Sequence, residues 1–214
     1  GQQCISIERI YVDQAIASTF TDRFAQRVAS LQLGAEQEYG AEVGALASAA
    51  QLEKMTEHVD DAVGKGARVV AGGKARPEIG PFFYEPTVLA EITPEMDVYR
   101  EETFGPLVSI YPYTSVDDAV DAVNDTEYGL NSSVYCGDTS KGRKIGERLM
   151  SGTVNINDGY SSGWGSLDAP MGGMKASGVG RRHGREGILK YTEAQNVTVQ
   201  HVVGFGGVRG VSDE

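Results

Sequence analysis

The chain has 214 residues and a formal net charge of -11, from 19 basic and 30 acidic side chains, which argues against nucleic-acid binding and against binding to anionic membrane surfaces. Hydrophobic residues make up 40% of the sequence, as expected for one globular domain, and no apolar run approaches the roughly 20 residues that span a bilayer. Because the start lacks the features of a secretory signal and the chain has only two cysteines, we expect a cytoplasmic protein.

Apolar residues recur with alternating strand and helix periods along the chain. In the first helical stretch Ile16, Phe20, Phe24 and Val28 share one face, and Asp13 is expected to cap it. In chain order the sequence predicts a strand over 5–12, a helix between 13 and 34, a helix over 48–63, strands over 68–71, 82–92 and 107–113, a helix over 116–123, a strand over 132–136, a helix over 139–150, a strand over 153–156, a helix over 186–193 and a strand over 197–203. This alternation predicts an α/β fold with a largely parallel sheet covered by helices on both faces.

One long segment lacks any apolar period. Residues 158–184 are rich in Gly and Ser, and loops of this length in a compact domain are usually functional or disordered. The Gly-rich tail over 204–214 is expected to be mobile.

Motifs for phosphate or metal binding are weak. The glycine clusters near 173–180 and 204–209 lack the endings of a P-loop or a dinucleotide fingerprint, so turn glycines are the better interpretation. The histidines, at positions 58, 183 and 201, have no metal-ligand spacing, and we expect no metal site.

The two cysteines differ in their surroundings. Cys136 lies at the end of a predicted strand and is interpreted as structural, whereas Cys4 follows a polar, flexible start and is expected on a loop that leads into a strand. A buried structural thiol and a nucleophile both remain open for Cys4 as a single residue. The pair Glu101 and Glu102 precedes a buried strand, and loop residues held by a rigid element often carry function.

Five motifs in order give the chain a resemblance to the aldehyde dehydrogenase superfamily, from Gly1 to about Gln200. They are the cysteine motif GQQC at 1–4, EETFGP at 101–106, NDTEYGL at 124–130, SGTVNIN at 151–157 and PMGGMKASGVG at 170–180.

The resemblance implies oxidation of an aldehyde to a carboxylic acid. Cys4 would attack the aldehyde carbon to give a thiohemiacetal and then a thioester, with NAD or NADP as the cofactor. In the family pattern Glu102 binds the nicotinamide ribose and Phe104 packs beside that sugar and ring. Gln51 and Lys54 match positions at the adenine-side ribose, although Lys54 is equally compatible with a solvated helix face.

The substrate side is implied less closely. Tyr160 and Met171 are candidate walls of the aldehyde pocket, and many family members have Phe where Met171 stands. The sequence around Asp168 to Gly184 resembles members of the succinate-semialdehyde dehydrogenase type, in which an arginine clamp on the substrate carboxylate would fit. Arg181 and Arg182 could supply it or be surface charges, and the choice between NAD and NADP is left open.

By the same resemblance, residues 1–196 are expected to form a catalytic domain truncated on its N-terminal side, with the cofactor-binding domain absent, so that the chain alone would not oxidise aldehydes. Residues 197–214 would hold an oligomerisation strand and tail that pair with a second subunit in a homodimer or homotetramer. Two alternatives remain. One is a non-catalytic oligomerising domain that keeps a thiol, and the other is a cysteine hydrolase, for which the sequence does not single out a histidine as the general base.

Overall fold

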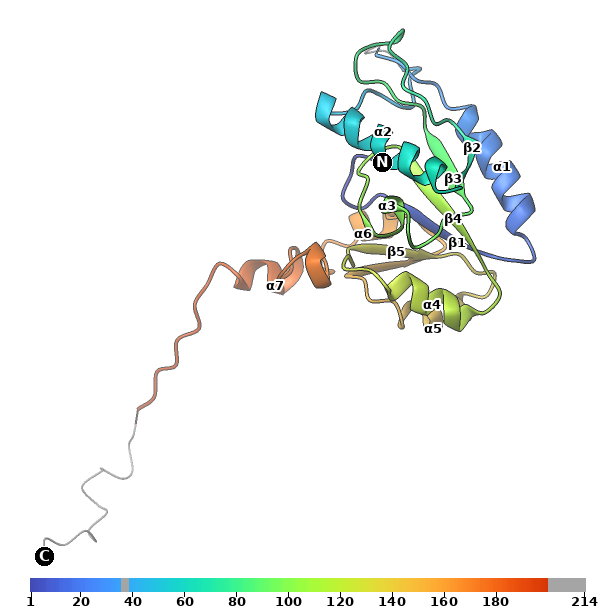
Figure 1. The fold of residues 1–214 in the computed structure, drawn as a ribbon. Coiled ribbons are helices and arrows are strands. Elements are labelled where there is room, and N and C mark those ends of the chain that lie inside the picture. Colours follow the sequence, from blue (N-terminus) through green and yellow to red (C-terminus); the bar gives the residue numbers. More distant parts are fainter. Residues whose placement is uncertain (36–38, 200–214) are drawn as a thin grey trace, which may run out of the picture.

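The computed structural model describes residues 1–35 and 39–199, which form two β-sheets with helices packed around them (Figure 1). The larger sheet has four strands in the order β1-β4-β3-β2, and the smaller sheet pairs β5 with β6. The pairs β1/β4, β3/β4 and β5/β6 are parallel, while β2 is antiparallel to β3. The bounds of the strands are β1 Arg9–Asp13, β2 Arg68–Ala71, β3 Thr87–Ala90, β4 Leu107–Tyr113, β5 Asn131–Val134 and β6 Thr153–Ile156.

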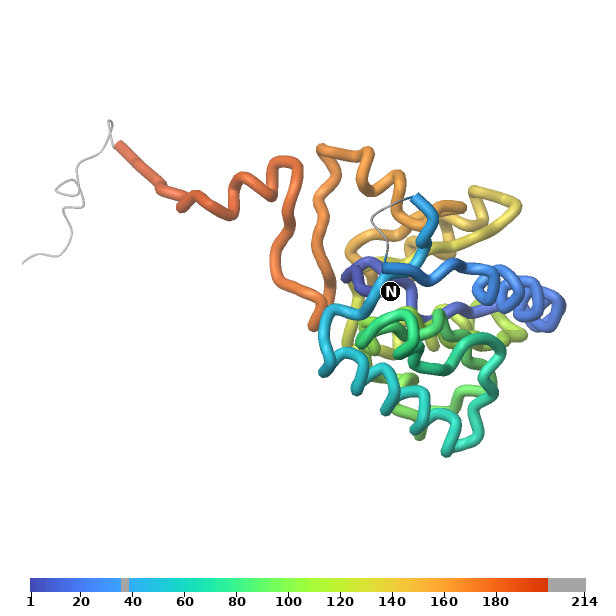
Figure 2. Tube along the Cα trace, turned by 90° about the horizontal axis from the view of Figure 1, so that it is seen from above, coloured from blue at the N-terminus to red at the C-terminus, as the bar shows by residue number. Residues whose placement is uncertain are grey.

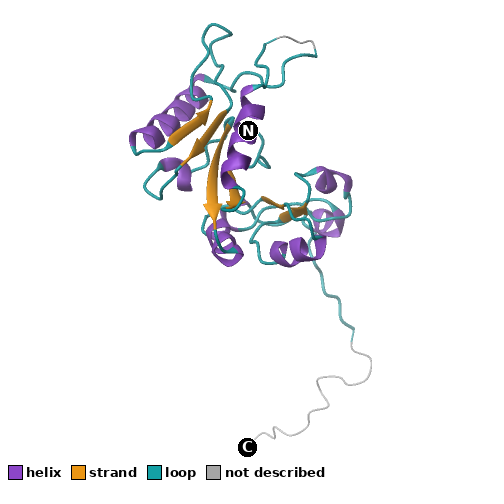
Figure 3. Cartoon of the chain, turned by 90° about the vertical axis from the view of Figure 1, so that its right-hand side faces the viewer, coloured by secondary structure: helices purple, strands orange, loops and turns teal. Residues whose placement is uncertain are grey.

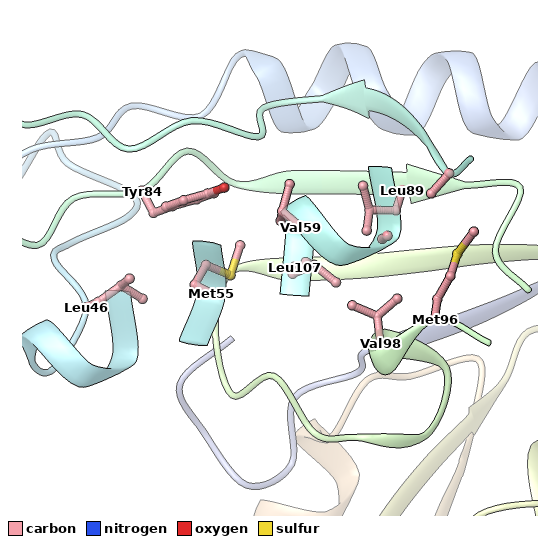
Figure 4. Packing of buried hydrophobic residues seen from close by; sticks show 10 residues of the cluster. Leu46, Met55, Val59, Tyr84, Leu89, Met96, Val98 and Leu107 are labelled. Carbon is pink, nitrogen blue, oxygen red and sulfur yellow. The ribbon is translucent and has the colours of Figure 1, made fainter. Parts of the chain in front are cut away.

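Helices cover both faces of the four-stranded sheet, which confirms the predicted α/β architecture (Figure 3). One face packs against α1 (Ala17–Ala29), whose Phe20 and Phe24 lie over Val88 and Ile110 of the sheet. Successive residues of a strand point to opposite faces, so Leu89 lies on the other side, in a cluster with α2 (Ala49–Gly64) and α3 (Asp97–Arg100). Figure 4 shows this second cluster, whose buried members are Leu46, Met55, Val59, Ala62, Ala67, Tyr84, Leu89, Met96, Val98 and Leu107.

The smaller sheet is covered by α5 (Thr139–Gly146), and a Cβ atom on its Gly142 would lie 3.0 Å from Cγ2 of Ile156 on β6. The helix and the sheet are therefore in close contact. The helix α4 (Val116–Asn124) lies beside β4, and cations meet its carboxyl end: Arg9 donates to the Val123 carbonyl at 3.2 Å, and Lys175 donates to the Asn124 carbonyl at 2.6 Å. Positive charge at this end of a helix opposes the helix dipole.

Several predicted boundaries are wrong. The first strand begins at Arg9 rather than at residue 5, because the chain before it turns, with the Ser6 N–H donating to the Gln3 carbonyl at 2.9 Å. Asp13 does not cap α1, since its carboxylate accepts the Ala15 N–H at 2.9 Å in the turn before the helix. The strand expected over 82–92 is only β3, since its first part bonds to loops instead: the Phe82 carbonyl accepts the Leu46 N–H at 2.8 Å.

The glycine-rich segment is partly ordered into short elements, α6 (Ser161–Gly165) and a 3-10 turn (Lys175–Ser177), and α7 (Gly184–Leu189) follows it. Beyond α7 the described chain leads away from the body in both Figure 1 and Figure 2. Of the strand expected over 197–203, residues 197–199 are not in a strand, and residues 200–203 lie outside the described residues, as does the tail. Within the described residues, no helix is long and apolar enough to cross a membrane.

Candidate active site around Cys4

Cys4 lies on a loop, as the sequence predicts, and the structure shows that it is exposed. The side chain of Gln2 fixes the chain just before it: its Nε2 donates to the Ala45 carbonyl at 3.1 Å, and its Oε1 accepts the Ala47 N–H at 2.8 Å. Just after the cysteine, the Asn131 side chain donates to the Ile5 carbonyl at 3.0 Å. The thiol therefore stands on a loop whose backbone is anchored on both sides.

The loop of Cys4 touches the segment over 101–106 at two points. Before the cysteine, the Gly105 carbonyl oxygen leaves no room for a Cβ atom on Gly1, so these two backbones are in contact. After the cysteine, the Glu8 carboxylate accepts the N–H of Thr103 at 2.9 Å and the N–H of Phe104 at 2.8 Å. Since at most four residues separate Cys4 from either contact, and each residue of extended chain spans about 3.5 Å, the thiol stays near this segment.

The peptide units of Thr103 and Phe104 are held from two sides, an arrangement that we call the Glu8–Gln51 clamp. Glu8 accepts both N–H groups, and the Gln51 Nε2 donates to the Thr103 carbonyl at 2.7 Å and to the Phe104 carbonyl at 3.0 Å. All four backbone polar groups of the two residues are thereby bonded to side chains, two to Glu8 just before β1 and two to Gln51 on α2.

The clamp holds a strained residue. Phe104 has a φ of 53°, in the left-handed region that bulky side chains rarely adopt. Such a conformation costs about 1–3 kcal/mol and persists only where the surroundings fix it. The four hydrogen bonds of the clamp provide that constraint.

Burial raises the pKa of Glu8, and the nearby Glu102 carboxylate adds to this effect. The two backbone N–H donors and the Lys54 ammonium act in the opposite direction and favour the charged carboxylate. The two backbone hydrogen bonds are thus the main compensation for taking this carboxylate partly out of water.

A buried histidine supports the same segment from α2. The His58 Nδ1 lies 3.0 Å from the Thr103 Oγ1, and its Nε2 lies 3.5 Å from a Glu101 carboxylate oxygen. Burial lowers the pKa of His58, as does the nearby Lys54 ammonium, so the ring is neutral at pH 7. Positions 51, 55 and 58 lie on one face of a helix, and Met55 completes this face by contacting Gly105.

The structure brings together most of the residues that the sequence singles out for the cofactor. Glu102 is exposed and has no hydrogen bond or ion pair to the part of the chain that the structure describes, and Phe104 is half-buried. Lys54 is half-buried and lies near Glu8 and His58. Gln51 does not project freely toward solvent, because its amide nitrogen already donates to the backbone carbonyls of Thr103 and Phe104.

The candidate substrate residues lie in the segment over 158–184. Tyr160 is half-buried, and its ring meets that of Trp164 edge to face at 5.8 Å. Met171 forms an antiparallel bridge with Arg182, with backbone hydrogen bonds of 2.7 and 2.6 Å.

The two neighbouring arginines have different surroundings. The Arg181 guanidinium donates to the carbonyls of Gly173 at 2.9 Å and Gly180 at 2.8 Å, and so holds the loop together. The Arg182 guanidinium lies 3.3 Å from the Met171 sulfur, is exposed, and forms no ion pair with any described carboxylate. Of these two arginines, Arg182 is the exposed one, and its guanidinium lies beside a candidate pocket residue instead of bonding to backbone carbonyls of the loop.

Sequence reasoning missed Glu8 and the role of His58 beside Thr103. Glu8 could be noticed because it is a charged residue inside the strand predicted over 5–12, four residues after Cys4. His58 could be noticed because it shares the apolar face of a predicted helix with Met55 and Val59. Among the described residues, no group of three metal-ligating side chains comes together.

The model of the aldehyde dehydrogenase family matches residues 1–197. A Mycobacterium ulcerans protein named putative succinate-semialdehyde dehydrogenase NADP(+) 2 is 57% identical over 99% of this chain and 41% of its own length. Escherichia coli succinate-semialdehyde dehydrogenase NADP(+) GabD is 38% identical over 93% of this chain and 40% of its own length. The chain thus spans about 40% of the length of these relatives.

Solved structures agree with this match. The Mycobacterium tuberculosis aldehyde dehydrogenase complexed with NAD+ has a TM-score of 0.84 and 35% identity, covering 90% of this chain and 39% of that one. Succinate-semialdehyde dehydrogenase from Burkholderia pseudomallei has a TM-score of 0.83 and 39% identity, covering 89% of this chain and 39% of that one.

Alkylation with iodoacetamide at pH 7 is expected to modify Cys4 well before Cys136. Cys4 is exposed on its loop, whereas Cys136 is half-buried, with its backbone N–H and carbonyl both bonded to the Asn157 side chain at 2.7 and 2.9 Å. Mass spectrometry of digested samples taken at intervals measures both rates in one experiment. Equal rates, or faster labelling of Cys136, would contradict the expectation.

Proposed function

The chain belongs to the aldehyde dehydrogenase family, and we propose that it supplies the thiol nucleophile of an NAD(P)-dependent oxidation of an aldehyde to a carboxylic acid. The observation that carries this proposal is the exposed Cys4 on a loop joined, before and after the thiol, to the backbone that presents Glu102 and Phe104.

In this proposal the Cys4 thiolate adds to the aldehyde carbon, and the carbonyl oxygen becomes the hydroxyl of a thiohemiacetal. Oxidation of that carbon leaves a thioester, and attack by water breaks the carbon–sulfur bond, releasing the carboxylic acid and restoring the thiol. The anchored loop keeps the sulfur in one place throughout, which reduces the entropy lost in reaching the reactive geometry.

The residues around the clamp fit a nicotinamide cofactor. Such a cofactor supplies the hydride acceptor when bound. The exposed Glu102 carboxylate, which has no bond to other described side chains, suits the hydroxyls of a ribose, and the half-exposed ring of Phe104 suits the flat face of the sugar and base. The Lys54 ammonium is the candidate for the adenine-side ribose, while Gln51 acts on the clamp.

We propose succinate semialdehyde as the substrate. The names of the two relatives above support this choice, and so does the exposed Arg182 beside Met171, since an arginine fork binds a carboxylate through two parallel hydrogen bonds. Tyr160 and Met171 would be the apolar walls that enclose the chain between the aldehyde and the carboxylate.

We further propose that residues 1–196 form the catalytic portion and that residues 197–214 pair with a second copy of the chain. The support is a run of exposed apolar side chains away from the body: Ile188, Leu189, Tyr191, Val197 and Val199 are between 49% and 79% exposed. Apolar surface of this kind marks an interaction site in a stable protein.

Cys4→Ser in the complete natural gene product is expected to lower kcat for NAD(P)-dependent oxidation of succinate semialdehyde by on the order of a thousandfold or more, because the nucleophile is lost. Absorbance of the reduced cofactor measures the rate, and Cys136→Ser is the matched control with unchanged kcat. Residues 1–214 alone are expected to be inactive. A Cys4→Ser protein that keeps its activity would exclude the proposed chemistry.

Arg182→Gln is expected to raise the KM for succinate semialdehyde about 10- to 100-fold, since a hydrogen bond to a charged group contributes about 1.5–3 kcal/mol. The KM for butanal, which has the same chain length and no carboxylate, should not change. Arg185→Gln, on the exposed side of α7, is the control for a general loss of charge. Equal KM changes for both aldehydes would show that Arg182 does not bind the carboxylate.

Replacing Tyr191 and Val197 together by Asp is expected to reduce the assembly size, because the two carboxylates would have to be buried without partners. Size-exclusion chromatography with light scattering gives the mass. Tyr135→Asp, at a residue 72% exposed on the body, is the matched control. An unchanged mass in the double variant would place the contact elsewhere.

A further inference from the structure

The Glu8 carboxylate joins the loop of Cys4 to the segment that carries Glu102 and Phe104. We infer that Glu8 is a positioning residue for the nicotinamide end of the cofactor site, an inference that rests on the function proposed above. It acts through the backbone of Thr103 and Phe104 and does not itself contact the cofactor.

The chemistry of the clamp requires a carboxylate at this position. Two successive N–H groups point at one side chain, at 2.9 and 2.8 Å, and each needs an acceptor. An ionised carboxylate has two oxygens and only accepts, whereas an amide of the same shape has one oxygen and an NH2 group that would face an N–H. A glutamine at position 8 can therefore satisfy one of the two donors.

The two hydrogen bonds act on the residue whose backbone is least relaxed. Phe104 has a φ of 53°, and the N–H of the same residue is one of the two that Glu8 accepts. Without that bond the backbone can return to a negative φ, which turns the aromatic ring and the adjoining Glu102 to new directions. The direction of both candidate cofactor ligands thus depends on one carboxylate.

The effect of Glu8 is expected to be local. Neither of the two hydrophobic clusters includes Glu8, and the sheet next to it is held by its own ladder between β1 and β4. The link also begins four residues after Cys4, so the same carboxylate fixes the distance between the thiol's loop and the segment over 101–106. A role in the fold alone would not require the strained residue to lie at the contact.

The test uses the complete natural gene product and the variants Glu8→Gln, Glu8→Ala and Glu8→Asp. Glu91→Gln is the control, since Glu91 is an exposed carboxylate paired with Arg68 at 2.8 Å. Fluorescence titration measures the Kd of NADPH and, by competition, the Kd of adenosine 2',5'-bisphosphate, which lacks the nicotinamide. Hydrogen exchange measures the protection of the Thr103 and Phe104 amides, and thermal unfolding measures Tm.

Glu8→Gln is expected to weaken NADPH binding about tenfold, Glu8→Ala more, and Glu8→Asp less. The order follows the number of acceptor oxygens that each side chain offers to the two N–H groups: none in Ala, one in Gln and two, on a shorter side chain, in Asp. The KM for the cofactor should follow the same order, while the Kd of adenosine 2',5'-bisphosphate stays unchanged. Exchange at Thr103 and Phe104 should accelerate in Glu8→Gln and Glu8→Ala. Glu91→Gln should match the wild type in every measurement.

The inference is overturned if exchange at Thr103 and Phe104 accelerates while the Kd of NADPH stays at the wild-type value, because Glu8 would then serve the fold alone. It is also overturned if both ligands weaken equally in step with a loss of Tm. Should Glu8→Ala fail to fold, Glu8→Asp and Glu8→Gln decide. A wild-type protein that neither binds NADPH nor oxidises an aldehyde would refute the proposed function instead, and the exchange measurement would still report on the clamp.

Discussion

A single carboxylate, that of Glu8, accepts hydrogen bonds from two successive backbone N–H groups and joins the loop of Cys4 to the segment that carries Glu102 and Phe104. Burial raises the pKa of Glu8, whereas the N–H groups of Thr103 and Phe104 act in the opposite direction and favour the charged carboxylate. The strained φ of Phe104 in turn needs the carboxylate. Each feature stabilises the other, and together they link a thiol near the start of the sequence to a segment about a hundred residues later.

The elements that the sequence predicts well are those in which one apolar face decides the structure. Met55 and Val59 recur on α2 at helical spacing, and Ser48 caps it by accepting the Gln51 N–H at 3.2 Å, so this helix could be placed almost to the residue. Boundaries fail where polar contacts to distant segments take over. β1 starts late because the chain before it turns and is bonded to a distant segment, with the Asn131 side chain donating to the Ile5 carbonyl. The helix α3 was missed because a helix of four residues has too few positions to show a period.

In the candidate site, the sequence identifies the groups that face outward and misses those that hold them. Cys4, Glu102 and Phe104 lie in short motifs that resemble those of the aldehyde dehydrogenase family, so the resemblance could name them in advance. Gln51 donates to the backbone of the clamp, and His58 contacts the Thr103 hydroxyl. Both partners are about fifty residues away in the sequence, and the sequence pattern does not distinguish these two side chains from other polar residues of the helix. Which of Arg181 and Arg182 has its guanidinium bonded to the loop backbone also depends on a hydrogen bond to the Gly173 carbonyl that no spacing predicts.

The two sides of the proposed site differ in how firmly they are built. Thr103 and Gly105 are buried, and this segment is hydrogen-bonded to Glu8, just before β1, and to Gln51 on α2. The opposite side, around Tyr160 and Met171, rests on a five-residue helix with no buried residue and on one two-residue bridge. A nicotinamide cofactor presents the same chemical groups whatever aldehyde is oxidised, so its side can be rigid. Substrates differ in length and charge, and a loop with few buried contacts can change to fit them at little cost in stability, because surface substitutions usually alter the free energy of unfolding by less than about 0.5 kcal/mol.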